Sequence, residues 1–243
     1  MSESKGVVLV IGAGVATGGA VAKRFAREGY IACVARRKLD KLEDLVAEIE
    51  AEGGQARAFA VDSTQEGQVV DLIAEIERDV GPIEVAVYNA AIGARHSIAE
   101  FPSEDYERVW RVNCFGAFVM GREVSKRMLE RGRGTILFTG ATAALRGRAG
   151  LAAFAGSKHA LRALSESMAR ELFPKNIHVA HIIIDGPIDT PLIRKMMPQV
   201  FEERPSDGVL APADIADTYF AIHSQKRSAW THEMELRPWV EPW

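Results

Sequence analysis

The sequence predicts a single-domain α/β protein of three layers, in which helices cover both faces of one doubly wound parallel sheet. Two observations lead to this fold class. Short apolar runs rich in Val, Ile and Leu alternate with longer amphipathic stretches, a pattern typical of strands buried on both faces between helices. No repeat, low-complexity tract or linker divides the chain, so residues 1–243 are expected to form one domain.

The expected strands and helices alternate along the chain. Strands are expected at Val7–Ile11, Ile31–Ala35, Ala58–Val61, Ile83–Tyr88, Thr135–Thr139, Ile177–Ile184 and Glu233–Leu236. Helices are expected at Gly19–Glu28, Leu39–Glu52, Gln65–Asp79, Ser103–Arg131 and Ala153–Phe173. Ligands of such sheets bind at the carboxyl ends of the strands, so the residues that follow each strand are the candidates for a site.

Composition narrows the function classes. With a net charge of -3 and 26% charged residues, the chain has no broad basic surface, so we expect neither nucleic acid nor an anionic membrane as a partner. No apolar run reaches the roughly 20 residues that span a bilayer, and the N-terminus lacks a secretory pattern, so a cytoplasmic location is expected.

No metal site is expected, since His178 and His181 would face opposite sides of one strand. Cys33 and Cys114 are interpreted as reduced core residues.

A glycine-rich turn joins the first strand to the first helix. It contains Gly12, Gly14 and Gly18, with Thr17 at the expected helix start. Glycine lets the backbone approach a pyrophosphate, and the unpaired N–H groups of a helix N-terminus attract that anion. The strand before and the helix after favour a Rossmann-type nucleotide loop over a purely structural turn.

The second strand indicates which dinucleotide binds. An NAD site would place an acid near its end, to accept a hydrogen bond from the ribose 2'-hydroxyl. The strand leads instead into Arg36 and Arg37, whose guanidinium groups can pair with a 2'-phosphate. NADP is therefore the predicted cofactor and NAD the alternative; a solvated basic turn is the other interpretation of the two arginines.

The order of these motifs resembles the short-chain dehydrogenase/reductase family. The resemblance rests on the glycine loop, Asp62, the run Tyr88-Asn89-Ala90-Ala91, Asn113, the spacing of Phe154 and Lys158, and Gly186-x-Ile188-x-Thr190, and it extends from Val7 to about Leu236. It implies an NADP(H)-binding oxidoreductase acting on a small molecule. The cofactor contacts that it implies are Gly12, Gly14, Thr17, Gly18, Arg36, Arg37, Asp62, Asn89, Ala90, Lys158, Gly186, Ile188 and Thr190.

The chain departs from the family at its catalytic positions. The family's catalytic set is Asn, Ser, Tyr and Lys; Asn113 and Lys158 match it, but Phe154 stands at the tyrosine position and Ala141 at the serine position. The combination resembles a small branch that keeps the lysine and has phenylalanine for tyrosine. Ala16 also stands where the glycine loop usually has glycine.

Other groups must then handle the proton that accompanies hydride transfer. Asp185 follows the sixth strand and is either an acid at the nicotinamide or a turn residue beside Gly186. Thr142 and Thr139 flank the vacant serine position, with Thr142 preferred, and each can equally be a simple strand-end hydroxyl.

Further groups near the expected site have two interpretations each. Tyr88 is a weaker candidate for proton transfer, because its position normally supports the sheet. Arg146 and Arg148 either hold an anionic substrate or lie in a solvated loop.

Two hypotheses of different class follow. The first is an oxidoreductase with an altered proton path, which reduces an activated C=C or C=O bond of a small apolar substrate beneath a lid at about residues 191–212. The second is a dinucleotide-binding protein without turnover, acting as a sensor or scaffold. A third reading is that Ala16 closes the phosphate loop, so that no dinucleotide binds.

A homodimer or homotetramer is also expected. The resemblance implies that helices Ser103–Arg131 and Ala153–Phe173 pair across a two-fold axis. The tail residues Trp230, Trp239 and Trp243 are expected to bury against a neighbour.

Overall fold

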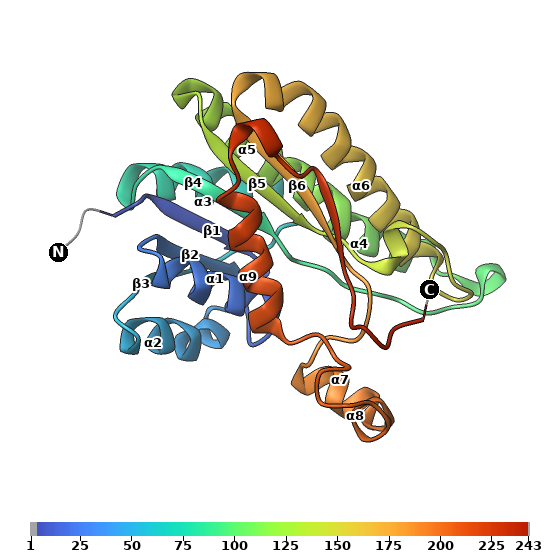
Figure 1. The fold of residues 1–243 in the computed structure, drawn as a ribbon. Helices are drawn as coiled ribbons and strands as arrows, with labels where there is room; N and C mark the ends of the chain where they lie inside the picture. The colour runs from blue at the N-terminus through green and yellow to red at the C-terminus, as the bar shows by residue number, and fades with distance from the viewer. Residues whose placement is uncertain (1–3, 243) are drawn as a thin grey trace.

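The computed structural model describes residues 4–242, which form one seven-stranded sheet in the order β3-β2-β1-β4-β5-β6-β7, with every adjacent pair parallel (Figure 1). The strands are β1 Val7–Ile11, β2 Ile31–Arg36, β3 Gln55–Ala60, β4 Ile83–Tyr88, β5 Gly134–Thr139, β6 Ile177–Ile184 and β7 Glu233–Leu236. The strand order reverses between β1 and β4, which is the arrangement of a doubly wound Rossmann fold. The predicted fold class is confirmed.

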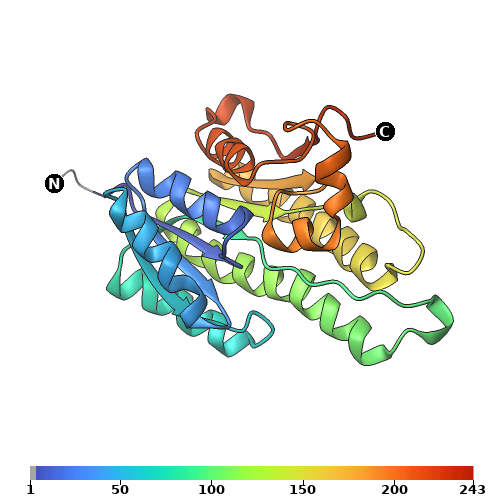
Figure 2. The same ribbon diagram turned by 90° about the horizontal axis from the view of Figure 1, so that it is seen from below.

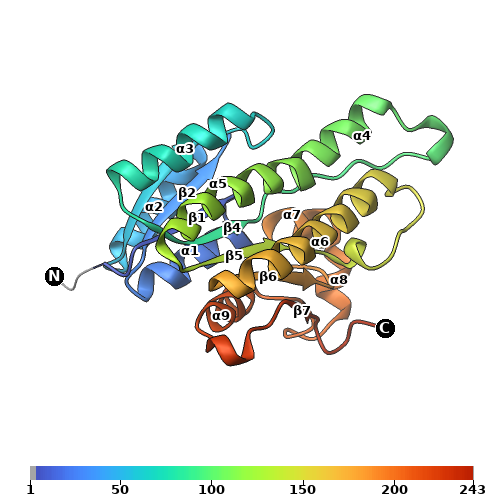
Figure 3. The ribbon, with the colours of Figure 1, turned by 90° about the horizontal axis from the view of Figure 1, so that it is seen from above.

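Helices form the two outer layers. In Figures 2 and 3, α1, α2 and α9 cover one face of the sheet, and α3, α5 and α6 cover the other. Their bounds, together with those of α4, are α1 Thr17–Arg27, α2 Glu43–Ala51, α3 Glu66–Asp79, α4 Ser103–Trp110, α5 Gly116–Arg131, α6 Ala152–Leu172 and α9 Pro212–His223. Each layer packs on its own side of the sheet and buries a separate core.

The two cores follow from the alternation of side chains along each strand. In β1, Val7, Leu9 and Ile11 belong to the core shared with α3, α5 and α6, whereas Val8 and Val10 belong to the core shared with α1, α2 and α9. All five are buried, because a central parallel strand is covered on both faces. The continuous apolar runs of the sequence thus correspond to doubly covered strands.

Several predicted boundaries need correction. The third strand is Gln55–Ala60 and not Ala58–Val61, because pairing with β2 begins at Ile31 and Gln55. This edge strand is only partly buried, so its apolar signal is weak. The first helix begins at Thr17, earlier than Gly19. The region predicted as one helix from Leu39 is a 3-10 turn at Leu39–Leu42 followed by α2.

The long helix predicted at Ser103–Arg131 is interrupted. A π-helical turn at Arg111–Phe115 separates α4 from α5 and contains Asn113. Single π turns inside α-helices occur frequently at functional sites.

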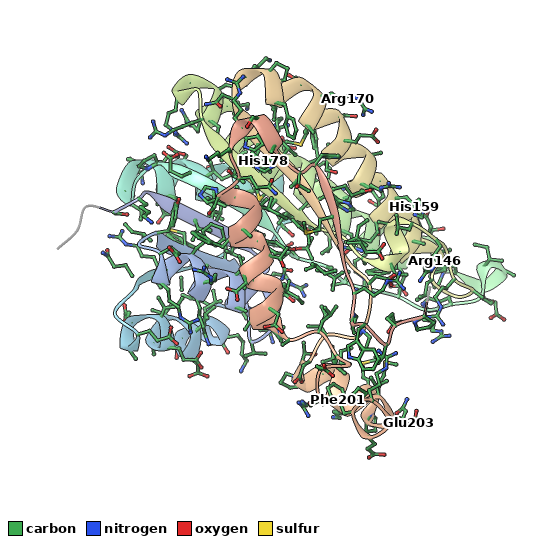
Figure 4. All side chains as sticks on the ribbon, in the orientation of Figure 1. Arg146, His159, Arg170, His178, Phe201 and Glu203 are labelled. Carbon is green, nitrogen blue, oxygen red and sulfur yellow. The ribbon has the colours of Figure 1, made fainter. Side chains whose placement is uncertain are left out.

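The region predicted as a lid contains two short helices. They are α7 Pro191–Met196 and α8 Pro198–Glu203, which project below the sheet in Figure 1. Leu192 and Met196 in α7 are exposed, and the ring of Phe201 packs against the Arg194 guanidinium at 4.5 Å (Figure 4). α9, which follows, was not predicted; its apolar side chains are buried against α1. Within residues 4–242 no helix is long and apolar enough to cross a membrane.

Candidate active site

The glycine loop brings β1 and α1 against the end of β4. Gly12 has a φ of +92°, and a side chain there would place its Cβ 2.3 Å from the Ala90 nitrogen. A Cβ on Gly18 would lie 2.5 Å from the Gly12 carbonyl oxygen. At Gly12 both the backbone angle and the space exclude a side chain, and at Gly18 the space alone excludes one.

The start of α1 lacks a side-chain cap. Ala16 precedes the helix and no side chain accepts from the first-turn N–H groups, while Thr17 is buried beneath the loop. These N–H groups are therefore available to bind an anion. Together they form the set of hydrogen-bond donors that a pyrophosphate requires. Ala16 is compatible with this donor set.

A groove of about 690 Å³ begins at the glycine loop and runs beside α1. Its lining includes Gly14, Ala16, Arg36 and Lys41, together with the first turn of α9. Arg36 is half-buried and its Nη1 lies 3.3 Å from the Cβ position of Gly14. Arg37 is exposed and does not line the groove. The structure therefore distinguishes two arginines that the sequence treated alike. Lys158 is not among the residues that line this groove.

Asn89 joins the ends of three strands. Its Nδ2 donates to the Gly12 carbonyl at 3.0 Å, and its Oδ1 accepts from the Thr139 hydroxyl at 3.0 Å. The Thr139 hydroxyl also pairs with the Tyr219 hydroxyl at 2.7 Å. Thr139 is thus bonded within the scaffold, which removes it as a source of the missing hydroxyl.

Tyr88 is likewise a structural residue. Its hydroxyl donates to the Val112 carbonyl at 2.5 Å and pairs with the Ser63 hydroxyl at 3.0 Å, from which it can accept. Burial raises the pKa of this phenol, so it is a poor proton donor at neutral pH. Its weak candidacy for proton transfer has no support in the geometry.

Asn113 and Lys158 lie close to each other beneath the site. The Asn113 amide exchanges hydrogen bonds with the Ile92 backbone, from Ile92 N at 2.9 Å and to Ile92 O at 3.0 Å, and also donates to Ser157 at 2.9 Å. Lys158 Nζ donates to the Thr139 carbonyl at 2.8 Å, and burial lowers the pKa of this amine to about 8. The Phe154 ring centroid lies 5.9 Å from Nζ, on the same face of α6. The Lys158 amine is thus held at the end of β5, with an aromatic ring beside it that carries no hydroxyl.

Thr142 and Asp185, expected as separate candidates, form a pair. Thr142 Oγ1 donates to Asp185 Oδ1, which joins the loop after β5 to the end of β6. Asp185 is 1% exposed, and its Oδ2 accepts from Arg237 and, at 3.5 Å, from Arg146. Figure 4 shows Arg146 in the loop over this end of the sheet. Ala141 adjoins the pair in extended backbone and contributes only a methyl group.

The remaining predicted residues lie along the same edge of the sheet. Asp62 Oδ1 accepts from Thr64 N at 3.0 Å and from Thr64 Oγ1 at 2.8 Å, so it shapes the turn after β3. Gly186 follows Asp185, Ile188 is bridged to Leu210, and Thr190 caps α7 by accepting from Ile193 N at 3.1 Å. The fold thus gathers residues from the carboxyl ends of β1 to β6.

Arg237 is a site residue that sequence reasoning missed. A signal was present, because two adjacent parallel strands, β6 and β7, were both predicted. Their register pairs Ile184 with Leu236, so the next residues, Asp185 and Arg237, are neighbours of opposite charge. Arg148 is an exposed loop residue and makes no contact comparable to that of Arg146.

The histidines considered in the sequence do not belong to this group of site residues. His178 stacks on Trp230 at 4.7 Å between ring centroids, and His181 Nδ1 lies 3.1 Å from a Glu233 carboxylate oxygen. His159 is exposed on the outer side of α6 (Figure 4). In the described part of the chain no group of three or more potential ligands is placed to hold a metal. Cys33 and Cys114 are buried free thiols.

The tail tryptophans differ from one another. Trp230 packs inside its own chain, against His178, so the expectation that it buries against a neighbour is corrected. Trp239 is 73% exposed. Trp243 lies outside the described residues.

The fold and the glycine loop define a protein of the Rossmann class, and comparison with known proteins gives the family. The family model for short chain dehydrogenases matches residues 6–200, so the chain belongs to this family. A 2,3-dihydro-2,3-dihydroxybenzoate dehydrogenase of Bacillus subtilis is 33% identical over 187 residues, which is 76% of this chain and 70% of that protein.

Solved structures agree with this assignment. The crystal structure of a short-chain dehydrogenase from Rhodopseudomonas palustris is 42% identical, with a TM-score of 0.84 over 98% of this chain and 100% of the other. A metagenomic short-chain oxidoreductase in complex with NADP has a TM-score of 0.84 at 24% identity, over 98% of each chain, and shares the fold.

Proposed function

We propose that the protein is an NADP(H)-dependent oxidoreductase that reduces an activated C=O or C=C bond of a small apolar substrate, with Thr142 and Asp185 moving the proton. The observation that carries this proposal is the Thr142–Asp185 hydrogen bond at the strand ends, next to Ala141 at the vacant serine position. A bound nicotinamide dinucleotide supplies the hydride, and the chain must supply or remove the proton.

The hydrogen bond defines the route of the proton relay. Thr142 donates to Asp185, so its oxygen lone pairs are free to accept a proton from a substrate hydroxyl while its own proton passes to the carboxylate. In the reducing direction each transfer reverses: the protonated Asp185 carboxyl returns a proton to Thr142 as the Thr142 proton leaves to the substrate, and the carboxylate takes up a proton from water before the next turnover. One proton enters and one leaves the threonine oxygen in either direction.

The residues at the glycine loop fit the cofactor. The close approach at Gly12 and Gly18 and the uncapped start of α1 form a cradle for the pyrophosphate. Arg36 lines the groove beside Gly14, where its guanidinium would pair with the 2'-phosphate, and no acid follows β2 directly. Lys158 would donate to the nicotinamide ribose hydroxyls. We therefore favour NADP over NAD, and the NADP complex of the metagenomic relative shows that this fold accommodates NADP.

The second candidate function is a dinucleotide-binding protein without turnover. Phe154 and Ala141 support it, because a sensor or scaffold has no need of the two oxygens that are missing. The two candidates share the cofactor loop and differ only in whether the Thr142–Asp185 pair exchanges a proton with a substrate.

Ligand-induced stabilisation followed by turnover tests the proposal. NADPH at 100 times its dissociation constant should stabilise the fold by about 2.7 kcal/mol, and NADH at the same concentration should stabilise it less. NADPH oxidation is then measured with aldehydes, ketones, enones and enoyl thioesters. We expect steady turnover with at least one class. Binding without turnover across the panel favours the second candidate, and absence of both contradicts dinucleotide binding.

We also propose a homodimer or homotetramer that forms through the outer surfaces of α5 and α6. A groove of about 360 Å³ lies between these helices and is lined by Phe118, Leu129, Leu164 and Met168. Phe118 and Leu129 are each 39% exposed. A monomeric mass in solution would contradict this proposal.

A further inference from the structure

Arg237 connects the buried carboxylate of the site to the C-terminal segment. Its Nη2 bonds both Asp185 Oδ2 and, at 2.8 Å, Glu235 Oε1, and its Nη1 donates to the Pro242 carbonyl at 2.7 Å. The Arg237 side chain is 11% exposed and that of Asp185 is 2% exposed. A buried carboxylate is stable only when it is paired, so this guanidinium determines how Asp185 is held.

The segment after Arg237 folds into a turn between the sheet and the lid. Glu241 N donates to Pro238 O at 3.0 Å, closing the turn at residues 238–241. Pro238 Cδ lies 2.7 Å from the Cβ position of Gly186, so the proline packs where only glycine leaves room. On the other side, Glu241 forms an ion pair of 2.7 Å with Arg204, the residue that follows α8.

Arg237 lies at the centre of these contacts. Its guanidinium bonds both the Asp185 carboxylate and the Pro242 carbonyl, just after the turn. The backbone of Asp185 has a separate hydrogen bond, from its N–H to Leu236 O at 2.8 Å. The backbone bond fixes where Asp185 is, and Arg237 fixes which way its two oxygens point.

We propose that Arg237 is a positioning residue that directs Asp185 Oδ1 toward Thr142 and couples this orientation to closure of the C-terminal turn against the lid. The inference rests on the proposed function, in which the Thr142–Asp185 pair moves the proton. Without Arg237, the remaining cation at Asp185 is Arg146, which is half-exposed and 3.5 Å away. The carboxylate would then turn toward Arg146 or water, and the bond to Thr142 would be lost.

Three variants test the role of Arg237. Arg237→Met removes the guanidinium, Arg237→Lys restores a cation, and Arg133→Met is the matched control, since Arg133 forms a bidentate pair with Glu84 at the other end of the sheet, at 2.8 and 3.0 Å. Turnover is measured with NADPH and the substrate class identified by the panel. Exchange of backbone amide hydrogens is measured at Asp185 and Glu241, whose N–H groups bond Leu236 and Pro238.

We expect Arg237→Met to lower kcat at least about tenfold while KM for the substrate changes less than threefold, because orientation of the proton-transfer pair affects the chemical step more than binding. Arg237→Lys should recover part of kcat, and Arg133→Met should match the wild type. Amide exchange at Asp185 and Glu241 should accelerate in Arg237→Met alone.

The two measurements separate the possible failures. A wild-type protein without turnover contradicts the proposed function, yet faster exchange at Asp185 and Glu241 would still support the coupling through Arg237. Unchanged kcat in Arg237→Met of an active enzyme overturns the positioning role, and so does unchanged exchange at both amides. A fall in kcat that lysine does not recover and that Arg133→Met shares would indicate a general loss of stability.

Discussion

The two halves of the site, which meet between β4 and β5, differ in how their polar groups are used. On the side of β1, β2 and β4, Asn89 and Asn113 each bond backbone groups in addition to one side-chain hydroxyl, and a Cβ on Gly12 would lie 2.3 Å from the Ala90 nitrogen. On the side of β5, β6 and β7, side chains bond one another: Thr142, Asp185 and Arg237 form a chain. The first half is a rigid cradle, and the second contains the groups able to exchange protons.

Under the proposed function, the second half is where the chemistry of this chain differs from that of its family. In the first half, the Asn113 amide bonds the Ile92 backbone. In the second half, Lys158 on α6 donates to the Thr139 carbonyl at the end of β5, Phe154 and Ala141 stand at the positions that the resemblance aligns with the catalytic tyrosine and serine, and Asp185 follows β6. Residues that differ from the family motif in one half only are expected when cofactor binding is retained and the route of the proton changes.

The largest expected effect comes from breaking the proton-transfer pair. Asp185→Asn keeps the shape of the side chain but cannot accept a proton, and Thr142→Val removes the hydroxyl. Loss of a proton-transfer group costs about 10²–10⁴-fold in rate. We expect kcat to fall in this range in both variants while NADPH-induced stabilisation is unchanged, as measured by initial rates and thermal unfolding.

Asp189→Asn is the control for these variants. Asp189 forms an exposed ion pair with Arg194 at 2.6 Å, four residues after Asp185. Its rate should stay within about threefold of the wild type, since exposed pairs contribute little. A rate loss in Asp189→Asn equal to that of Asp185→Asn would show that the loop, and not the carboxyl chemistry, was disturbed.

The pH dependence of the free energy of unfolding tests the burial of polar groups in the β5–β7 half of the site. Burial lowers the pKa of His181 to about 4, although Glu233 acts in the opposite direction. In the unfolded chain this imidazole binds a proton near its ordinary pKa of about 6.5. Between these two values the unfolded state binds the extra proton, so the free energy of unfolding falls as the pH falls from about 6.5 to about 4.

His181→Leu should remove this dependence. At about 1.4 kcal/mol per pKa unit, the wild type should lose roughly 3 kcal/mol more than the variant over the same pH range, measured by urea unfolding. His159→Leu is the control, because His159 is exposed on α6. Parallel pH curves for the wild type and His181→Leu would contradict a neutral buried His181.

The difference between the two halves of the site also explains which features the sequence could predict. The fold and the placement of Asn113 and Lys158 follow from periodicity and from motifs whose partners are backbone groups, which any sequence forming those elements supplies. The Thr142–Asp185 bond depends on two side chains 43 residues apart, so spacing alone did not reveal it. The edge strand β3 was misplaced because its half-exposed surface weakens the apolar pattern. α9 was missed because its burial depends on contact with α1.

The smallest expected effect distinguishes the two arginines after β2. Arg36 lines the groove beside Gly14, whereas Arg37 is exposed and outside it. A charge-assisted hydrogen bond contributes about 1.5–3 kcal/mol, so Arg36→Met should raise the dissociation constant for NADPH at least about tenfold and leave that for NADH nearly unchanged. Arg37→Met should raise it less than twofold. Titration with both dinucleotides, followed by cofactor fluorescence, measures these constants. Equal losses for NADPH and NADH in Arg36→Met would mean that Arg36 holds the loop and not the 2'-phosphate, and the preference for NADP would then lack its main support in the first half of the site.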